Sequence, residues 1–316
     1  MTRPRVLHAA PLTPWLDAQL AQAYELTHLP PAGAARAAFV AAQGGEFDAV
    51  ATSASRGIAN ELIDAMPRLR VISSFGVGLD RIDTAHAARR GIAVGYTPEL
   101  LNDCVADAAW GLLMDVARGF SAADRFVRLG RWGEGAFPLG TRVSGKRLGI
   151  VGLGRIGRVV AGRAQGFDME IRYHNRSRVA DVPYGYAETL LELARWADFL
   201  IVVSAGGADT RHLVDAEVLD ALGPRGFLVN VSRGSVVDEA ALVRALQQRT
   251  IAGAGLDVYE NEPRVPPALM ALDNVVLLPH IASGTQETRQ AMAELVLANL
   301  QSFFATGQVR VAAPHA

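Results

Sequence analysis

The stretch Gly149-Ile150-Val151-Gly152-Leu153-Gly154-Arg155-Ile156-Gly157 decides the fold, and Arg158-Val159-Val160-Ala161 follows it directly. The apolar residues before the first of the three spaced glycines are typical of a buried strand, and the residues after the last fit a helix. In this context the first glycine permits a tight turn, the second lets the backbone approach a pyrophosphate, and the third lets the helix pack on the strand. Amides at the helix N-terminus would then bind the anion. The predicted dinucleotide contacts of this loop are Gly152, Gly154, Arg155, Ile156 and Gly157.

On both sides of this loop, short β-rich runs alternate with helix-like stretches. This is the pattern of parallel βαβ units with helices on both faces of a sheet. On the C-terminal side, strands are expected near residues 170–173, 199–203, 227–231, 251–256 and 274–278. On the N-terminal side, strands are expected near residues 5–8, 49–52, 71–73 and 92–94. We therefore predict an α/β protein with two doubly wound parallel-sheet domains.

Two long helical signals indicate how the domains are connected. Residues 99–130 are expected to form a largely buried linking helix, because their apolar residues recur at helical spacing. Its apolar positions are Val105, Ala108, Ala109, Leu112, Leu113 and Val116. The second signal, residues 286–304, follows the last expected strand and could cross back onto the first domain. We therefore expect a discontinuous first domain of residues 1–98 and 285–316, and a dinucleotide-binding domain of residues 99–284.

The composition excludes several classes of protein. Of the 316 residues, 50% are hydrophobic and 20% are charged, which is close to the globular average. Lys and Arg number 31 against 32 Asp and Glu, and the basic residues are scattered along the chain. A net charge of −1 without a basic patch predicts neither a nucleic-acid partner nor a membrane partner.

The cysteine content and the N-terminus indicate the compartment. Cys104 is the one cysteine of the sequence, so neither an internal disulfide nor a cysteine-based metal cluster can form, and no metal site is predicted. The apolar run before Pro11 is too short for a signal-peptide core, and no stretch approaches 18 uninterrupted apolar residues. We expect a cytoplasmic protein.

The strand after the glycine loop predicts which dinucleotide is preferred. In units that bind NAD, an acidic residue at the end of this strand accepts hydrogen bonds from the adenosine ribose. Here Ile171-Arg172-Tyr173 ends in His174-Asn175-Arg176-Ser177-Arg178, without an acidic residue. Guanidinium groups bind phosphate, so NADP is predicted as the preferred cofactor, with NAD possible. The predicted contacts are Asn175, Arg176, Ser177 and Arg178, and the alternative is a solvated basic turn.

Three further segments, residues 231–234, 257–263 and 279–283, follow expected strands of the second domain. Ligands of doubly wound sheets bind at the carboxyl ends of the strands, so these segments could line one site. Together with the glycine loop and with Gly76-Val77-Gly78-Leu79-Asp80, they resemble the D-isomer-specific 2-hydroxyacid dehydrogenase family over nearly the whole chain. The resemblance implies a flavodoxin-like substrate-binding domain, a Rossmann dinucleotide-binding domain and a cleft between them.

The resemblance implies that Arg233, Glu262 and His280 form the catalytic set, and the chemistry of these residues agrees with it. Reduction of a 2-oxo acid needs a cation that holds the carboxylate and polarises the ketone, which suits the permanently charged Arg233. It also needs an acid that protonates the oxygen as hydride reaches the carbon, and histidine titrates closest to neutral pH. Glu262, if it pairs with His280, would orient the ring and stabilise its cationic form.

The resemblance also implies residues around the substrate and the cofactor. Backbone amides near Phe75, Gly76, Val77 and Gly78 would bind the substrate carboxylate opposite Arg233 and His280. Asp257 would face the nicotinamide carboxamide. The other implied cofactor contacts are Ser204, Val231, Ser232, Ser283 and Gly284. The family more often has a proline-containing segment where Ala205-Gly206-Gly207 stands, so this loop departs from the family pattern.

These features predict an NADP-preferring oxidoreductase that reduces a small 2-oxo acid to the D-2-hydroxy acid. Glyoxylate, hydroxypyruvate or an aromatic pyruvate would be the substrate, as in glyoxylate and hydroxypyruvate reductases. One alternative is phosphoglycerate dehydrogenase, whose long forms carry a regulatory extension that we expect this chain to lack. Another is a nucleotide-sensing binding protein, because transcriptional corepressors that resemble the family retain the same three residues.

The resemblance further implies a homodimer, with the helical region 99–140 as the contact because its apolar content exceeds what one linking helix needs. Trp132 and Phe137, in the glycine-rich stretch after that helix, could then reach a neighbouring active site. Cys104 is expected to be a small buried hydrophobe. Four histidines without a partner pattern are expected to be structural or exposed: His8, His28, His86 and His212.

Overall fold

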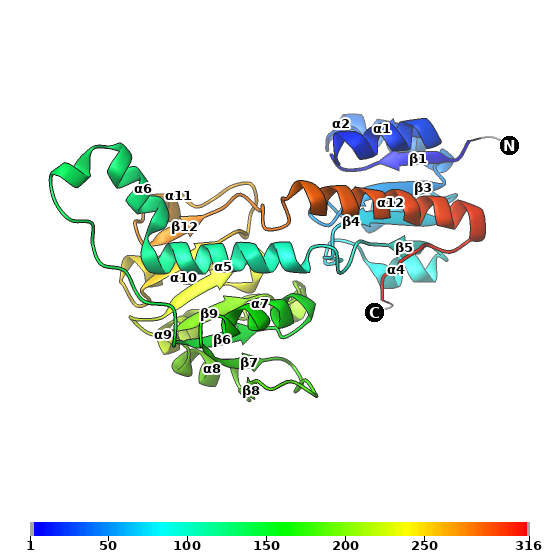
Figure 1. Cartoon of the computed structure of the whole chain (residues 1–316). Helices are drawn as coiled ribbons and strands as arrows, with labels where there is room; N and C mark the ends of the chain where they lie inside the picture. The colour runs from blue at the N-terminus through cyan, green and yellow to red at the C-terminus, as the bar shows by residue number, and fades with distance from the viewer. Residues whose placement is uncertain (1–2, 315–316) are drawn as a thin grey trace. The chain divides into compact units, whose positions relative to one another are not determined.

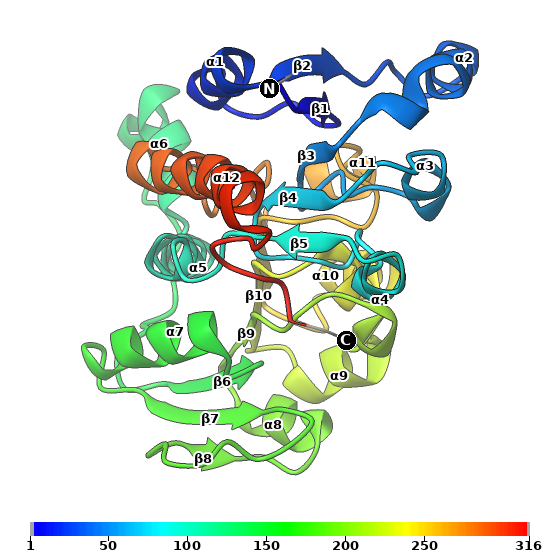
Figure 2. The same cartoon turned by 90° about the vertical axis from the view of Figure 1, so that its right-hand side faces the viewer.

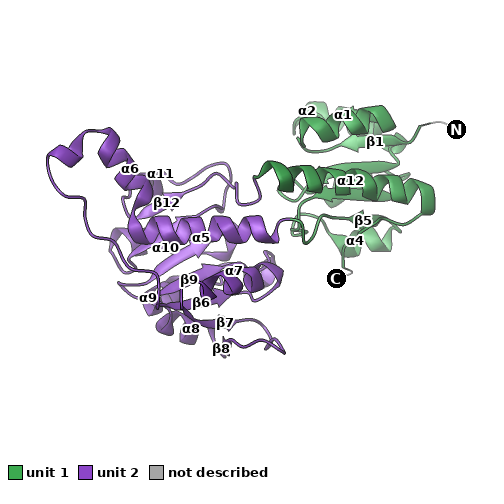
Figure 3. Cartoon of the chain, viewed as in Figure 1, with its two compact units in different colours: residues 1–100, 285–316 green, residues 101–284 purple. Residues whose placement is uncertain are grey.

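Two all-parallel sheets form the framework of the protein, one of five strands and one of seven. The computed structural model describes residues 3–314, and its chain divides into two units (Figure 3). Unit 1 comprises residues 1–100 and 285–316, and unit 2 comprises residues 101–284. Residues 1–2 and 315–316, which the predicted first domain includes, lie outside the described residues. The predicted fold class, two doubly wound parallel-sheet domains, is confirmed.

The sheet of unit 1 has the strand order of flavodoxin. Its strands are β1 (Arg5–His8), β2 (Glu25–His28), β3 (Ala49–Ser53), β4 (Val71–Phe75) and β5 (Ala93–Gly95). They lie in the order β2-β1-β3-β4-β5. Ala49 pairs with Val71 and Ser53 with Phe75, so β3 and β4 end at the same edge. Both strands are buried along their whole length, because helices cover both faces of the sheet.

The helices of unit 1 lie on both faces of this sheet (Figure 2). Helix α12 (Gln286–Thr306) packs along β4 and against α1 (Pro14–Ala23), while α3 (Asn60–Asp64) and α4 (Thr84–Arg89) lie on the opposite face. Strand β2 and helix α2 (Ala34–Gln43) were not predicted from the sequence. The residues of β2 are only partly buried and α2 has no buried residue, so neither segment carries the apolar pattern of an interior element.

The sheet of unit 2 has the strand order of a dinucleotide-binding fold. Its strands are β6 (Arg147–Val151), β7 (Glu170–His174), β8 (Gly185–Tyr186), β9 (Phe199–Val202), β10 (Phe227–Asn230), β11 (Gly253–Leu256) and β12 (Val275–Leu277). Their order is β12-β11-β10-β9-β6-β7-β8, so the chain winds outward from β6 to one side and then restarts at β9 on the other. The order reverses between β6 and β9, whose register pairs Val151 with Val202. A doubly wound sheet binds its ligand at this reversal point.

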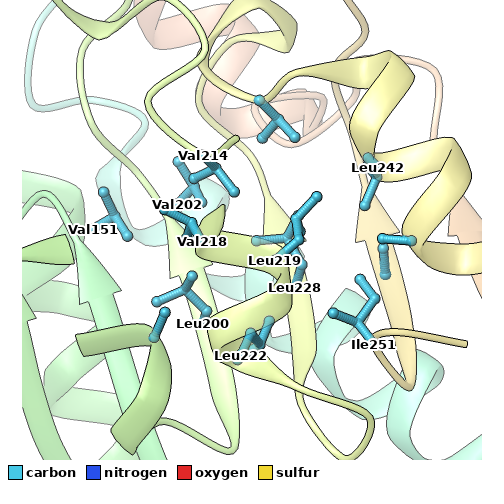
Figure 4. Packing of buried hydrophobic residues seen from close by; sticks show 14 of the residues in the cluster. Val151, Leu200, Val202, Val214, Val218, Leu219, Leu222, Leu228, Leu242 and Ile251 are labelled. Atoms are coloured by element: carbon cyan, nitrogen blue, oxygen red, sulfur yellow. The ribbon is translucent and has the colours of Figure 1, made fainter. Parts of the chain in front are cut away.

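Packing in unit 2 follows from apolar strands between two helical layers. Helices α5 (Asn102–Arg118) and α7 (Arg155–Gln165) pack on each other, and α5 also contacts β10 and β11. Helix α9 (Ala216–Leu222) packs against both α8 (Leu190–Trp196) and α10 (Glu239–Gln247). Between the sheet and helices α8, α9 and α10 lies a cluster of buried aliphatic side chains, including Val202, Val218 and Leu228 (Figure 4). This core fixes the strands whose ends carry the site.

The predicted single linking helix is wrong, because residues 99–130 form two helices. Helix α5 ends at Arg118, and α6 (Phe120–Arg128) starts after Gly119, which has the left-handed φ of 69° that glycine adopts without strain (Figure 1). Asp115 stabilises the break by accepting hydrogen bonds from the N–H and hydroxyl of Ser121. Helix α5 is largely buried, as predicted, whereas α6 has no buried residue.

Within residues 3–314, no helix has both the length and the apolar character that a membrane span requires. The longest of these helices, α12, carries Glu287, Arg289 and Glu294.

Candidate active site

The glycine loop lies between β6 and α7, where the strand order of unit 2 reverses. Gly152 has φ 101°, and a Cβ there would lie 2.8 Å from the backbone nitrogen of Ser204, which follows the neighbouring strand β9. A Cβ at Gly157 would lie 2.2 Å from the carbonyl oxygen of Gly152, so α7 packs this closely only because residue 157 lacks a side chain. A Cβ at Gly154 would meet no described atom within 4 Å. The amides at the start of α7 are therefore accessible to a pyrophosphate.

Ser204 supplies an independent sign that this loop is built for a ligand. Its Oγ is buried and has no hydrogen-bond partner among residues 3–314. A buried hydroxyl without a partner costs free energy, and a sugar or phosphate oxygen would satisfy it. The glycine geometry and this hydroxyl together fit a nicotinamide dinucleotide.

The end of β7 carries the basic cluster. Asn175 points inward, and its Oδ1 accepts a hydrogen bond from the N–H of Leu153 at 2.6 Å, which ties the cluster to the glycine loop. Residues 176–178 are exposed. Arg176 lies 3.6 Å from Asp209 in an ion pair between two solvent-exposed side chains. The two arginines of the cluster are therefore accessible to an anionic ligand.

His280 and Glu262 lie side by side after β12 and β11. The Nδ1 atom of His280 is 2.7 Å from Oε2 of Glu262, and Oε1 of Glu262 accepts a hydrogen bond from the N–H of Tyr259 at 3.1 Å. The pairing on which the predicted role of Glu262 depends is therefore present. The side chain of His280 is 35% exposed. Because Nδ1 faces Glu262, Nε2 is the nitrogen left to face a ligand.

The charge of Arg233 affects the pKa of Glu262, so Arg233 belongs to the same site. Burial is the largest single influence on the pKa of Glu262 and would raise it. The hydrogen bonds from His280 and Tyr259, together with the charges of His280 and Arg233, outweigh burial, so this pKa lies below its ordinary value. Glu262 is therefore ionised at neutral pH and can stabilise an imidazolium.

Asp257 holds the loop that carries His280. The N–H of His280 donates to the carbonyl of Asp257 at 2.9 Å, and the amides of Ile281 and Ala282 donate to its two carboxylate oxygens at 2.7 and 2.9 Å. The thiol of Cys104, which is buried as predicted, donates to the carbonyl of Ala282. These bonds keep His280 at φ 55°, a left-handed conformation that costs free energy for a non-glycine residue. Burial raises the pKa of Asp257. The predicted contact of Asp257 with the nicotinamide stays a prediction.

Arg233 lies after β10, and Asn230 fixes its backbone. Asn230 is fully buried, donates from Nδ2 to the carbonyl of Arg233, and accepts hydrogen bonds from the N–H and hydroxyl of Ser232. A Cβ at Gly206 would lie 2.6 Å from Cγ of Arg233, so this side chain packs directly on the glycine. Asn230 was not predicted from the sequence as a support of the site. Its signal is a polar residue at the end of an otherwise apolar strand.

The predicted substrate residues lie in unit 1, at the end of β4. Phe75 is buried, and the guanidinium of Arg289 lies 5.4 Å from the centroid of its ring. Gly76 has φ 141°, and a Cβ there would lie 2.4 Å from Cβ of Ala54. Thr97, which the sequence analysis missed, accepts from the N–H of Gly76 and donates its own N–H to the Gly76 carbonyl. The structure thus builds a fixed glycine turn here, and its contact with substrate stays a prediction.

Three histidines outside the site have carboxylate partners that the sequence pattern does not indicate. In each, Nε2 lies within hydrogen-bond distance of an aspartate or glutamate oxygen. The pairs are His8 with Asp17 (2.8 Å), His86 with Asp64 (2.8 Å) and His212 with Glu260 (3.1 Å). The sequence pattern does not reveal these pairs because the carboxylates come from other elements of the fold, and the pairs agree with the structural or surface role expected for these histidines.

The strand order, the glycine loop at the reversal point and the pair of His280 and Glu262 define a dinucleotide-binding α/β protein with an acid–base pair at the carboxyl edge of its sheet. The sequence profile described as "D-isomer specific 2-hydroxyacid dehydrogenase, NAD binding domain" matches residues 110–282. The chain belongs to the D-isomer specific 2-hydroxyacid dehydrogenase family, as the resemblance predicts.

Known relatives extend over nearly the whole chain. A hydroxyphenylpyruvate reductase from Plectranthus scutellarioides is 46% identical over 95% of this chain and 95% of its own. A glyoxylate/hydroxypyruvate reductase A from Arabidopsis thaliana is 48% identical over 81% of this chain and 82% of its own. The crystal structure of an NADPH-dependent glyoxylate/hydroxypyruvate reductase from Sinorhizobium meliloti, in complex with NADP and malonate, is 44% identical. It covers 99% of this chain and 98% of its own, with a TM-score of 0.94.

Proposed function

We propose that this protein reduces a small 2-oxo acid, glyoxylate or hydroxypyruvate first among them, to the D-2-hydroxy acid with NADPH. The observation that carries the proposal is the 2.7 Å pairing of His280 with an ionised Glu262, whose electrostatics also include Arg233. This arrangement supplies an acid and a permanent cation, the two groups that reduction of a 2-oxo acid requires. The names of the relatives, reductases of glyoxylate, hydroxypyruvate and hydroxyphenylpyruvate, support the same substrate class.

The proposed chemistry divides between charge and proton transfer. A nicotinamide dinucleotide, held by the glycine loop and the cluster after β7, would supply the hydride that reduces the carbonyl carbon of the substrate. Arg233 holds the substrate carboxylate and polarises the ketone. His280 gives the proton on Nε2 to the carbonyl oxygen, which becomes the hydroxyl, and Glu262 keeps the ring oriented through Nδ1 and balances the charge of the imidazolium. In unit 1 the amides of residues 75–78 are proposed to bind the substrate carboxylate.

The proposed preference for NADPH rests on the cluster after β7. Arg176 and Arg178 are exposed, and Asn175 ties their loop to the glycine loop. Two guanidinium groups without a carboxylate at the strand end favour a 2′-phosphate over a free ribose hydroxyl. The Sinorhizobium meliloti enzyme, NADPH-dependent by its description, supports this reading. The cofactor contacts proposed on this sheet edge, besides the glycine loop and the cluster, are Ser204, Val231, Ser232, Asp257, Ser283 and Gly284.

We also propose a homodimer that is located in the cytoplasm. Helix α6 and the segment after it carry large apolar side chains that are exposed on the single chain. These side chains are Phe120, Val127, Leu129, Trp132 and Leu139. Several large apolar side chains exposed within one short stretch of the chain support an interface there. The cytoplasmic location rests on the single, buried cysteine, which suits a reducing compartment.

Steady oxidation of NADPH, followed by absorbance with a panel of 2-oxo acids, tests the proposal. We expect turnover with glyoxylate and hydroxypyruvate and a lower kcat/KM with NADH in place of NADPH. Binding of NADPH without turnover of any 2-oxo acid would indicate a nucleotide sensor instead. Turnover confined to phosphohydroxypyruvate would indicate a phosphoglycerate dehydrogenase.

A further inference from the structure

Two tyrosine side chains, one buried and one half-buried, contact the loop that carries the basic cluster. Tyr173 lies in β7, is fully buried, and directs its hydroxyl at Val179. The hydroxyl accepts a hydrogen bond from the N–H of Val179 at 2.9 Å and donates one to the carbonyl of the same residue at 3.1 Å. A single side chain thus satisfies both backbone groups of a residue directly after Arg178.

The other end of the loop is held by Tyr186 of β8. Its hydroxyl donates to the carbonyl of Asn175 at 3.1 Å, while the side chain of Asn175 binds Leu153 in the glycine loop. The rings of Tyr173 and Tyr186 are in contact, with centroids 5.3 Å apart. Residues 175 and 179 are therefore both fixed to the sheet, and residues 176–178 between them project into solvent.

A fixed loop binds an anion more tightly than a mobile one, because less conformational entropy is lost on binding. The side chains of Arg176 and Arg178 lose conformational entropy on binding whether or not the loop is fixed. The entropic cost of binding can therefore be lowered only by fixing the backbone that carries them. Burial of a hydroxyl costs free energy unless the hydroxyl is paired, and phenylalanine at position 173 would fill the same space in β7 without this cost. The presence of tyrosine at both positions is explained if the two hydroxyl groups serve to fix this loop.

We propose that Tyr173 and Tyr186 are positioning residues that set the preference for NADPH over NADH by fixing the backbone of residues 175–179. Neither hydroxyl touches the cofactor in this proposal. Both act through the loop on the 2′-phosphate, the one group that distinguishes the two dinucleotides. The proposal rests on the proposed role of Arg176 and Arg178.

Tyrosine-to-phenylalanine variants test the proposal, because they keep the packed ring and remove only the hydroxyl. Tyr184→Phe is the matched control, since Tyr184 lies in the same loop region but its hydroxyl contacts Gln165 at 3.4 Å and not residues 175–179. Dissociation constants would be measured by calorimetry for NADPH, NADH, adenosine 2′,5′-bisphosphate and AMP. The last two ligands report on the adenosine end without any catalysis.

For Tyr173→Phe we expect the Kd of NADPH and of adenosine 2′,5′-bisphosphate to rise roughly tenfold, the usual size of one or two lost hydrogen bonds. The Kd values of NADH and AMP should stay within about twofold. Tyr186→Phe, at a half-buried site, should give a smaller shift in the same direction, and Tyr184→Phe none. Amide hydrogen exchange at Val179 in the ligand-free protein should accelerate in Tyr173→Phe.

Two results with the variants would overturn the proposal. Parallel weakening of phosphorylated and unphosphorylated ligands would assign the tyrosines a purely structural role, and unchanged ratios in both Tyr173→Phe and Tyr186→Phe would remove the role altogether. If Tyr173→Phe does not fold, Tyr186→Phe alone decides. Measurements on the wild-type protein distinguish failure of the tyrosine proposal from failure of the proposed cofactor preference. Equal affinity of the wild-type protein for adenosine 2′,5′-bisphosphate and AMP would refute the role of the arginine cluster. The tyrosine proposal, which rests on that role, would then fail as well.

Discussion

At the scale of single residues, the pair of His280 and Glu262 makes the strongest prediction about activity. His280→Ala should lower kcat for reduction by a factor of about 10²–10⁴, the usual contribution of a general acid. Glu262→Gln keeps the size of the side chain but removes the charge that stabilises the imidazolium. The alkaline limb of the reduction rate should therefore move to lower pH. The measurement is kcat against pH in both reaction directions.

The opposite direction of reaction supplies the control for this pair. Oxidation of the 2-hydroxy acid needs the neutral imidazole as a base, so its rate should rise with pH where reduction falls. A Glu262→Gln profile that coincides with wild type in both directions would disprove the functional pairing. A fully active His280→Ala protein would disprove the mechanism.

The ion pair between Arg176 and Asp209 predicts a gain of affinity. Asp209 lies 3.6 Å from Arg176, so its charge opposes a phosphate at the same guanidinium. Asp209→Asn should lower the Kd of NADPH about two- to fivefold, in keeping with the small free energy of an exposed ion pair, and leave the Kd of NADH unchanged. Asp220→Asn, on the exposed side of α9, removes the same charge as a control. A gain that persists in 0.5 M salt would contradict an electrostatic origin.

Residue identities in the site could be predicted where a type of side chain is required by chemistry. The prediction of Arg233, Glu262 and His280 rests on the family resemblance, the needs of a 2-oxo acid reduction agree with it, and the catalytic roles of these residues stay predictions. Their supports could not be predicted in the same way. Asn230 and Thr97 act through backbone groups of other loops, and such contacts depend on which strands become neighbours.

At the scale of elements, the loop after β9 packs against the side chain of Arg233. Gly206, in the segment where the family more often has a proline, leaves room for that side chain. Gly206→Ala would bring a Cβ to 2.6 Å from Cγ of Arg233, so the guanidinium must shift. We expect KM for the 2-oxo acid to rise about tenfold or more, with thermal stability little changed.

Gly162→Ala is the matched control for this loop substitution. A Cβ at Gly162, in the interior of α7, would meet no described atom within 4 Å, so this change should be neutral or slightly stabilising. An unchanged KM in Gly206→Ala would show that the function of the Arg233 side chain does not depend on the space beside Gly206.

Element prediction succeeded where burial imposes a pattern and failed at the surface. Strand β6 and helix α7 follow directly from apolar residues around three glycines. The end of α5 at Gly119 was missed because a single glycine inside a helical pattern is tolerated in many helices, and Asp115 and Ser121 had to be seen together to indicate a break. Edge elements such as β2 carry no apolar alternation that a sequence can reveal.

At the scale of the whole molecule, one partly buried ion pair predicts the response to acid. Arg147 starts β6 and binds Asp198, before β9, through its backbone N–H, Nε and Nη2. Burial raises the pKa of Asp198, but the hydrogen bonds and charge of Arg147 outweigh it and bring the pKa below its ordinary value. A carboxyl whose pKa is lowered in the folded protein stabilises it above the unfolded pKa of about 4, and this contribution is lost as pH falls through the folded pKa.

Asp198→Asn should therefore lower the free energy of unfolding by about 1–3 kcal/mol at pH 7 and by progressively less below pH 4. Thermal melting of both proteins from pH 7 to pH 3 measures this difference. Asp273→Asn removes an exposed ion pair with Arg249 and should cost less than about 1 kcal/mol. An Asp198→Asn protein as stable as wild type at pH 7 would contradict the assignment.

The last prediction concerns the assembly of whole chains. Helix α6 has no buried residue, and Val127 and Leu129 are 54% and 71% exposed. Such exposure on a helix is unfavourable in water unless another surface covers it. Light scattering of the wild-type protein at micromolar concentration should give twice the 33.6 kDa mass of the chain.

The double variant Val127→Asp, Leu129→Asp should give the mass of one chain, because two buried charges per subunit would oppose association. Met270→Asp, at an equally exposed apolar residue of α11 (Pro267–Met270), should remain a dimer. A wild-type protein that is monomeric at this concentration would refute the proposed interface, whereas a dimer that survives in the double variant would mean that a different surface joins the subunits.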